Sequence, residues 1–258
     1  MKNHYRKCIA AACGLTAMLL NAAPVSAHFP WLNLSDYTPD KGAKIKGTVG
    51  WGHSYPLDGF LEVEELEAIT VMGPAGKARE VIFPSALEWE SEEGVTDEGG
   101  YVVAAERKPG FYTKTSKGGK RASKKGLDGV TSCSYSHTSM KAVAGQGAAG
   151  DVAHISGLPM EIVPLDNPAA LKTGDYLHVR VLLHGKPYRG EILGTYAGFS
   201  TDSNTYAYAT STDAEGYGRI RILQPGLWLL KTTFASDYPD PEECDVEKYS
   251  TTLTLAVQ

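Results

Sequence analysis

The sequence predicts an all-β protein with two β-sandwich-like domains, the second of them immunoglobulin- or prealbumin-like. Apolar and polar residues alternate with period two in many short segments, for example in Ala43–Val49 and in Gly218–Leu223. Turn residues separate these segments, and the chain contains 28 Gly and 14 Pro. About seven such segments fall within roughly the last 100 residues, which is the spacing of an immunoglobulin-type sandwich.

The alternation places most of the strands. The expected strands are 29–34, 43–49, 66–72, 79–83, 100–106, 111–113, 160–165, 176–183, 191–199, 205–212, 218–223, 227–234 and 249–257. A weak helix is expected over Thr138–Ala144. The small residues of Gly145–Gly157 indicate a linker, so we expect an N-terminal β domain at 28–157 and a C-terminal one at 158–258.

Residues 1–27 have the pattern of a cleaved secretory signal peptide. Lys2, Arg6 and Lys7 give a positive start, an apolar run follows, and Val25-Ser26-Ala27 supplies the small residues of a cleavage site. The apolar run is shorter than the roughly 20 residues that a membrane-spanning helix needs. We therefore expect export to the periplasm.

Charge excludes some partners. The chain of 258 residues has a net charge of −5, and without the signal it has 22 basic and 30 acidic residues, a net charge of −8. Such a surface does not favour nucleic acid or an anionic membrane. The mature chain contains no second long apolar run, so we expect no transmembrane segment in it.

Two of the four cysteines, Cys8 and Cys13, lie in the expected signal. Cys133 and Cys244 remain, and two cysteines in an exported protein favour a disulfide that joins a loop of the first half to the loop before the last strand. The alternatives are a thiolate metal ligand or two free thiols.

Cleavage after Ala27 would make His28 the first residue of the mature protein. Its α-amine and imidazole could then chelate one metal ion, because both groups titrate close to neutrality. Nitrogen ligands of this kind suit Ni, Cu and Zn. The alternative is that His28 is simply the residue after the cut.

Other histidines could complete the site. His53 lies in Gly-Trp-Gly-His, where glycines allow close backbone approach, although it could also simply pack beside Trp51. His154 follows the flexible glycines and is a further candidate ligand, as is His137, four residues after Cys133.

Several motifs together resemble a known family. They are Ala27-His28, Gly52-His53-Ser54-Tyr55-Pro56, Glu106 to Thr115, Leu158 to Pro168, Gly185-Lys186-Pro187, Thr212-Asp213 with Gly216, and Pro225-Gly226-Leu227-Trp228. Their order is similar to that of an exported domain-of-unknown-function family described as the periplasmic component of a cobalt/nickel uptake system, which includes NikK-like proteins. The resemblance implies a β-sandwich, a periplasmic location and a role near nickel or cobalt transport.

These observations favour an exported metal-binding protein that takes Ni(II) or Co(II), with Cu(II) as a further candidate, and serves a membrane metal transporter. The chain has no phosphate-binding glycine loop, no H-E-x-x-H and no G-x-S-x-G, so we expect no enzyme. One alternative is a cell-envelope interaction module without metal, since sandwiches host such functions freely. Another is a copper oxygenase that acts on polysaccharide through an N-terminal His brace.

Overall fold

The computed structural model describes residues 28–96, 99–145 and 152–258. The expected signal peptide, 1–27, and residues 146–151 of the expected linker lie outside the described residues. The strands are β1 Phe29–Leu34, β2 Lys46–Gly52, β3 Gly59–Leu61, β4 Leu66–Met72, β5 Ala78–Arg79, β6 Val81–Ile82, β7 Glu88–Ser91, β8 Tyr101–Thr115, β9 Gly118–Lys120, β10 Val130–Ala144, β11 Met160–Pro164, β12 Tyr176–Leu183, β13 Lys186–Pro187, β14 Glu191–Tyr196, β15 Tyr208–Ser211, β16 Tyr217–Arg221, β17 Gly226–Asp237 and β18 Val246–Val257. Two 3₁₀ turns, η1 Val63–Glu65 and η2 Pro168–Ala170, complete the described elements.

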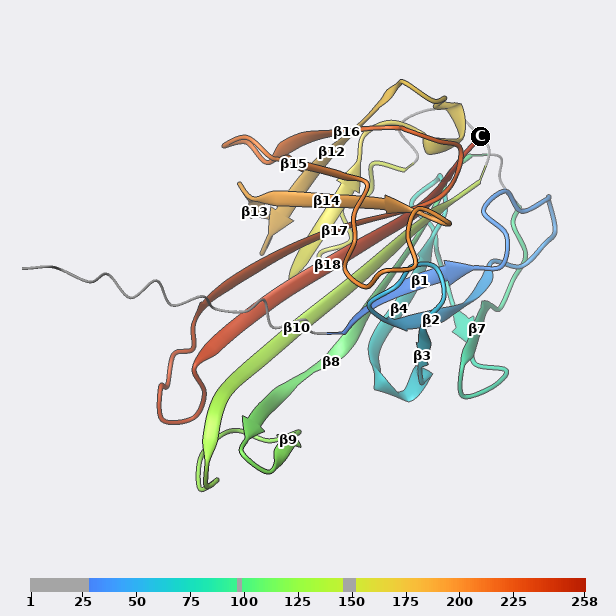
Figure 1. Ribbon diagram of the computed structural model, residues 1–258. Helices are drawn as coiled ribbons and strands as arrows, with labels where there is room; N and C mark the ends of the chain where they lie inside the picture. Colours follow the sequence, from blue (N-terminus) through green and yellow to red (C-terminus); the bar gives the residue numbers. More distant parts are fainter. Residues whose placement is uncertain (1–27, 97–98, 146–151) are drawn as a thin grey trace, which may run out of the picture.

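A nine-stranded sheet, here called the central sheet, organises these elements. Its order is β15-β14-β17-β18-β10-β8-β4-β5, with β9 paired to β8. A five-stranded sheet contains β1, β2, β3, β6 and β7, and a four-stranded sheet contains β11, β12, β13 and β16. The long strands β8, β10, β17 and β18 cross the whole molecule in Figure 1. The expected all-β sandwich class is confirmed.

The two smaller sheets cover opposite faces of the central sheet. Successive residues of a strand point to opposite faces of the sheet, so alternate residues of β10 contribute to different cores. Met140 and Ala142 belong to a core that includes Trp89 of the five-stranded sheet. Val143 belongs to a second core that includes Ile162 of the four-stranded sheet. The molecule is therefore two sandwiches that share one sheet. In the C-terminal sandwich, β11, β12 and β16 lie in one sheet and β15-β14-β17-β18 in the other, which is the strand division of an immunoglobulin-like sandwich, as expected from the sequence.

One expected element is wrong. Thr138–Ala144 is not a helix but the second half of β10, which pairs antiparallel with β8 and parallel with β18. Pairing on both edges satisfies the backbone of this segment and buries it, so tertiary contacts override its weak local preference. The expected division at 157 stays a prediction, although β10 and β18, which lie on either side of it, are neighbours in one sheet.

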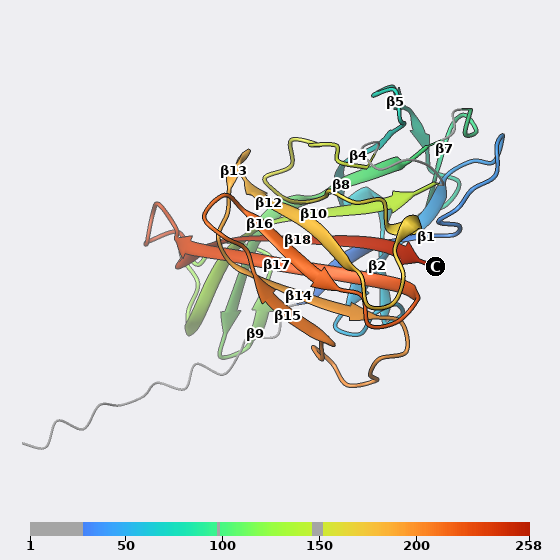
Figure 2. The ribbon, with the colours of Figure 1, turned by 90° about the horizontal axis from the view of Figure 1, so that it is seen from above.

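The far ends of the long strands extend beyond both smaller sheets (Figures 1 and 2). Here the expected disulfide is confirmed, since Cys133 and Cys244 are bonded with their Cα atoms 5.0 Å apart. Cys133 lies within β10 and not in a loop, contrary to expectation. The bond joins β10 to the segment before β18. Within the described residues no helix has the length and apolar character needed to cross a membrane.

Candidate metal centre

Strand pairing brings His28 and His53 together. Phe29, the first residue of β1, lies opposite Gly52, the last residue of β2. The residues one step beyond this antiparallel pair are His28 and His53, and their ring centroids are 4.2 Å apart. His28 is exposed and His53 is half-buried, so the pair lies at the surface, at one end of the five-stranded sheet.

The backbone around His53 is fixed on two sides. The carboxylate of Asp58 accepts a hydrogen bond from the His53 N–H at 2.7 Å, and the Asn204 N–H donates to the His53 carbonyl at 3.1 Å. Gly52 has φ +154°, and a side chain there would collide with Asp58. The glycine therefore permits the turn that presents His53 to His28.

Asp58 gives this corner a negative charge. The hydrogen bond from the His53 N–H is the main cause that lowers the pKa of Asp58; burial opposes it, and the Ser54 N–H and the two histidine rings act in the same direction as the hydrogen bond. Asp58 therefore stays ionised close to the two imidazoles. An ionised carboxylate near a pair of imidazoles favours a cation at this corner.

Aromatic rings and cations border the pair. The His28 ring stacks on Trp51 with centroids 5.6 Å apart and planes inclined by 12°. The Arg107 guanidinium lies 4.9 Å from the centre of the Trp51 ring. The Lys231 ammonium lies 3.7 Å from the centre of the ring of Phe29, the residue after His28. Burial lowers the pKa of Lys231 to about 8.

The donors fit a transition metal in kind. Two adjacent imidazoles suit Ni, Cu, Zn and Co, and an α-amine on His28 would add a third nitrogen. Within the described part of the chain, no three His, Cys, Asp or Glu side chains are grouped as a metal cage. A site at this corner therefore depends on the two rings together with the amine that cleavage after Ala27 would create.

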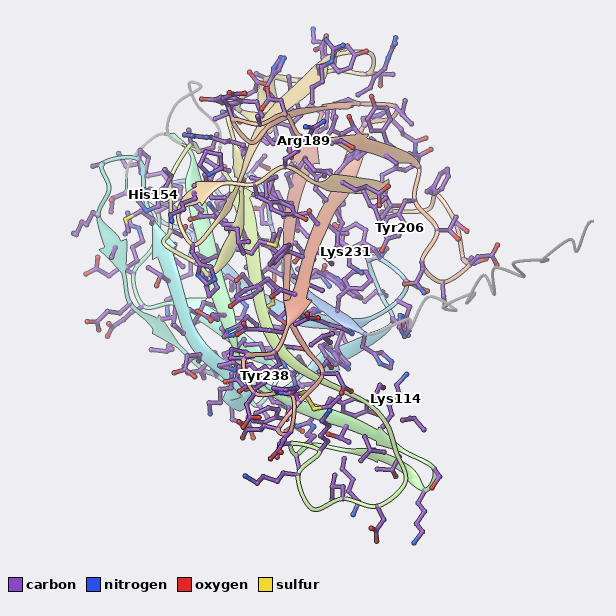
Figure 3. All side chains as sticks on the ribbon, turned by 90° about the vertical axis from the view of Figure 1, so that its left-hand side faces the viewer. Lys114, His154, Arg189, Tyr206, Lys231 and Tyr238 are labelled. Carbon is purple, nitrogen blue, oxygen red and sulfur yellow. A yellow bond between two sulfur atoms is a disulfide. The ribbon has the colours of Figure 1, made fainter. Side chains whose placement is uncertain are left out.

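The structure places His154 elsewhere. Glu106 and Arg107 are consecutive in β8 and point to opposite faces of the central sheet. Arg107 faces Trp51 and the histidine pair, whereas Glu106 lines a cavity together with His154. His154 is thus on the other face of the sheet, and Figure 3 shows it well apart from Lys231.

His137 is also separate from the pair. Its Nε2 lies 3.0 Å from Glu247 Oε1, and its ring stacks on Tyr249 with centroids 4.6 Å apart. Cys133 and Cys244 are bonded to each other, so neither can act as a thiolate metal ligand in this structure.

Sequence reasoning missed Asp58, Asn204 and Lys231 around this corner. Asp58 lies five residues after His53, and a turn between two short strands is the signal that could have suggested it. Asn204 and Lys231 come from the second half of the chain, and nothing in their local sequence connects them with His28. Trp51, the residue beside which His53 could have packed, stacks on His28.

Comparison with solved structures gives only distant likenesses. A two-domain fibronectin type III segment from chicken tenascin matches with a TM-score of 0.24 and 12% identity, over 88% of this chain and 97% of that one. The titin domains Z1Z2 in complex with telethonin match with a TM-score of 0.20 and 12% identity, over 89% and 96%. A search of curated proteins finds no match.

Comparison with family models gives one match over most of the chain. The model described as "Domain of unknown function (DUF4198)" matches residues 25–236, a range that includes His28 and His53. The chain therefore belongs to this family.

Proposed function

We propose that this chain is an exported, periplasmic protein that binds a divalent transition metal through His28 and His53. The observation that carries the proposal is the 4.2 Å separation of the two ring centroids at an exposed end of the β1–β2 pair. Two residues that are 25 positions apart in the sequence meet there because of the strand register.

The α-amine of His28 completes the proposed donor set. Signal cleavage after Ala27 would free this amine, and amine and imidazole of one residue then bind as a chelate. Nitrogen donors of this type favour Ni(II), and Co(II) and Cu(II) bind similar sets. The ionised Asp58 supports the proposal, because it places negative charge beside the two rings.

The resemblance to cobalt/nickel uptake components suggests the biological role. In this proposal the protein holds Ni(II) or Co(II) in the periplasm and presents it to a membrane transporter. The exposed position of His28 supports such a transfer, because a partner could reach the ion without unfolding either sandwich.

The test compares three forms of the mature protein by calorimetry with Ni(II), Co(II), Cu(II) and Zn(II). They are the form that begins at His28, a form with one Ala added before His28, and His53→Ala. Mass spectrometry of exported protein verifies the N-terminus. Each change removes one nitrogen donor, so affinity should fall by at least about tenfold, which is about 1.4 kcal/mol.

His178→Ala is the matched control, because His178 is exposed and its ring is paired with Asp166 at 2.8 Å, in a strand of the four-stranded sheet. It should leave affinity unchanged. Cu(II) should bind most tightly in vitro whatever the physiological metal is. Equal affinity of the extended and native forms for every metal would refute the chelate.

A further inference from the structure

A small cavity lies on the face of the central sheet that is opposite the histidine pair. It has a volume of about 210 Å³, and β4, β8 and the segment 154–158 enclose it. Met72, Val102 and Ala104 give it apolar walls, and Glu106, His154 and Ser156 are polar members of the lining. The volume is below the roughly 300–1,000 Å³ of pockets for drug-sized ligands, so it suits a smaller molecule.

A buried ion pair anchors the segment 154–158 that forms one wall of this cavity. Lys141 and Glu161 have side chains that are 0% and 1% exposed, and Lys141 Nζ lies 2.9 Å from Glu161 Oε2. Lys141 Nζ also donates to the His154 carbonyl at 2.7 Å. Glu161 accepts hydrogen bonds from the N–H groups of Ser156 and Gly157 at 2.9 and 3.1 Å. The ion pair thus fixes the segment 154–157 over β4 and β8.

Two polar groups of the lining have no hydrogen-bond partner within residues 28–96, 99–145 and 152–258. Glu106 is partly buried, and it makes no hydrogen bond or ion pair with a described residue. Burial raises the pKa of Glu106, an effect that His137 opposes and Glu67 reinforces. The Ser156 hydroxyl is buried and has no hydrogen-bond partner among the described residues. Buried polar groups are normally paired, so the Ser156 hydroxyl indicates a missing partner, and the half-buried Glu106 carboxylate lines the same cavity.

We propose that this cavity binds a small organic cation, namely a primary ammonium group on a short aliphatic chain. The ammonium pairs with the Glu106 carboxylate, and the Ser156 hydroxyl oxygen accepts a hydrogen bond from one of its N–H groups. The aliphatic chain lies against Met72, Val102 and Ala104. The site is separate from the proposed metal centre, because the central sheet lies between them.

The test is titration of the mature protein with n-butylammonium, followed by two-dimensional amide NMR. The shifts should saturate and concentrate at residues 102–106 and 154–158. Glu106→Gln should weaken binding by about tenfold or more, the usual size for loss of a charged hydrogen bond. Ala104→Leu, which fills the cavity, should abolish binding, and its thermal unfolding verifies that it folds.

Two controls define the outcome. Glu191→Gln removes an exposed carboxylate of β14 that does not line this cavity, and it should leave binding unchanged. Neutral n-butanol should bind at least about tenfold more weakly than the ammonium ion. The proposal is overturned if butylammonium gives no saturable shifts, if Glu106→Gln binds it as well as the native protein, or if Ni(II) perturbs the same amides at lower concentration.

Discussion

Lys141 and Lys231 lie on opposite faces of the central sheet, and each takes a positive charge out of water by a different route. Lys141 is fully buried beneath the four-stranded sheet and is paired with the carboxylate of Glu161. Lys231 lies on the side of the five-stranded sheet, where its ammonium sits over the Phe29 ring and 3.5 Å from the Tyr206 hydroxyl. It makes no ion pair with any described residue.

The two lysines differ in how far their surroundings offset the cost of removing an ammonium group from water. Burial lowers the pKa of Lys141, but Glu161 opposes this shift through its charge and its hydrogen bond. Nothing comparable opposes burial at Lys231, so its pKa falls to about 8. A carboxylate therefore stabilises a buried ammonium, whereas a ring and a hydroxyl leave most of the desolvation cost in place.

Glu161→Ala should have the largest effect on the stability of the fold. It leaves the Lys141 ammonium buried with only the His154 carbonyl, and it removes the acceptor for two backbone N–H groups of the segment 154–157. We expect a loss of about 3–5 kcal/mol in the free energy of unfolding. Urea denaturation at pH 7 measures it.

Two further variants sharpen this result. Glu90→Gln breaks the more exposed Lys44–Glu90 pair and should cost less than about 1 kcal/mol. Lys141→Met combined with Glu161→Leu removes both charges, so it should be less destabilising than either single change. A loss below about 1 kcal/mol for Glu161→Ala would show that water already reaches Lys141.

Much of the fold could be predicted because it depends on local alternation. The expected strands 29–34 and 176–183 agree with β1 and β12 at both ends. β10 was missed over Thr138–Ala144, because one face carries Ser139 and Lys141 and the other carries mostly small residues. Pairing with β8 on one edge and with β18, more than 100 residues away, on the other explains why this segment is a buried strand.

Some residues of the candidate site could likewise be predicted from local sequence, and others are placed only by tertiary structure. His28 and His53 could be proposed from the cleavage pattern and the glycine-rich motif, and strand register then brings their rings together. His154 could not be placed, because its face of the sheet is decided by the Lys141–Glu161 pair. Asn204 reaches His53 only through tertiary structure, which no local pattern records.

Lys231→Met should stabilise the fold, whereas Glu161→Ala destabilises it, and the change in the free energy of unfolding should be smaller. The native pKa of about 8 lies below the value of about 10.4 in unfolded chains, so the unfolded state binds more protons between these two values. Stability of the native protein therefore rises with pH from about 8 to about 10.5. Replacing the ammonium with a thioether should raise stability at pH 7 by about 1–2 kcal/mol, after allowance for solvent screening.

Denaturation of both proteins at pH 7, 9 and 10.5 tests this sign. The advantage of Lys231→Met should shrink as pH rises, because Lys231 loses its charge first in the folded state and then in the unfolded state of the unsubstituted protein. If Lys231→Met is less stable than the native protein at pH 7, the Phe29 ring compensates the charge as well as a carboxylate would.

Arg107 combines both kinds of compensation, since it binds the Glu65 carboxylate at 2.6 Å and lies over the Trp51 ring. Partial burial would raise the pKa of Glu65, but hydrogen bonds from Arg121 and Arg107 and their charges lower it overall. Glu65 therefore contributes stability at neutral pH that is lost as pH falls through its native pKa.

Glu65→Gln should accordingly cost only about 1 kcal/mol at pH 7, because both partners are partly exposed and the Trp51 ring still faces the guanidinium. The difference from the native protein should begin to shrink as pH falls below the unfolded value of about 4.3, and it should vanish only below the lowered native pKa of Glu65, where the side chain is neutral in both states. Urea denaturation at pH 7 and in a series of increasingly acidic buffers follows this decline. A cost as large as that of Glu161→Ala would mean that the ring contributes nothing and that Arg107 depends on its carboxylate as fully as Lys141 does.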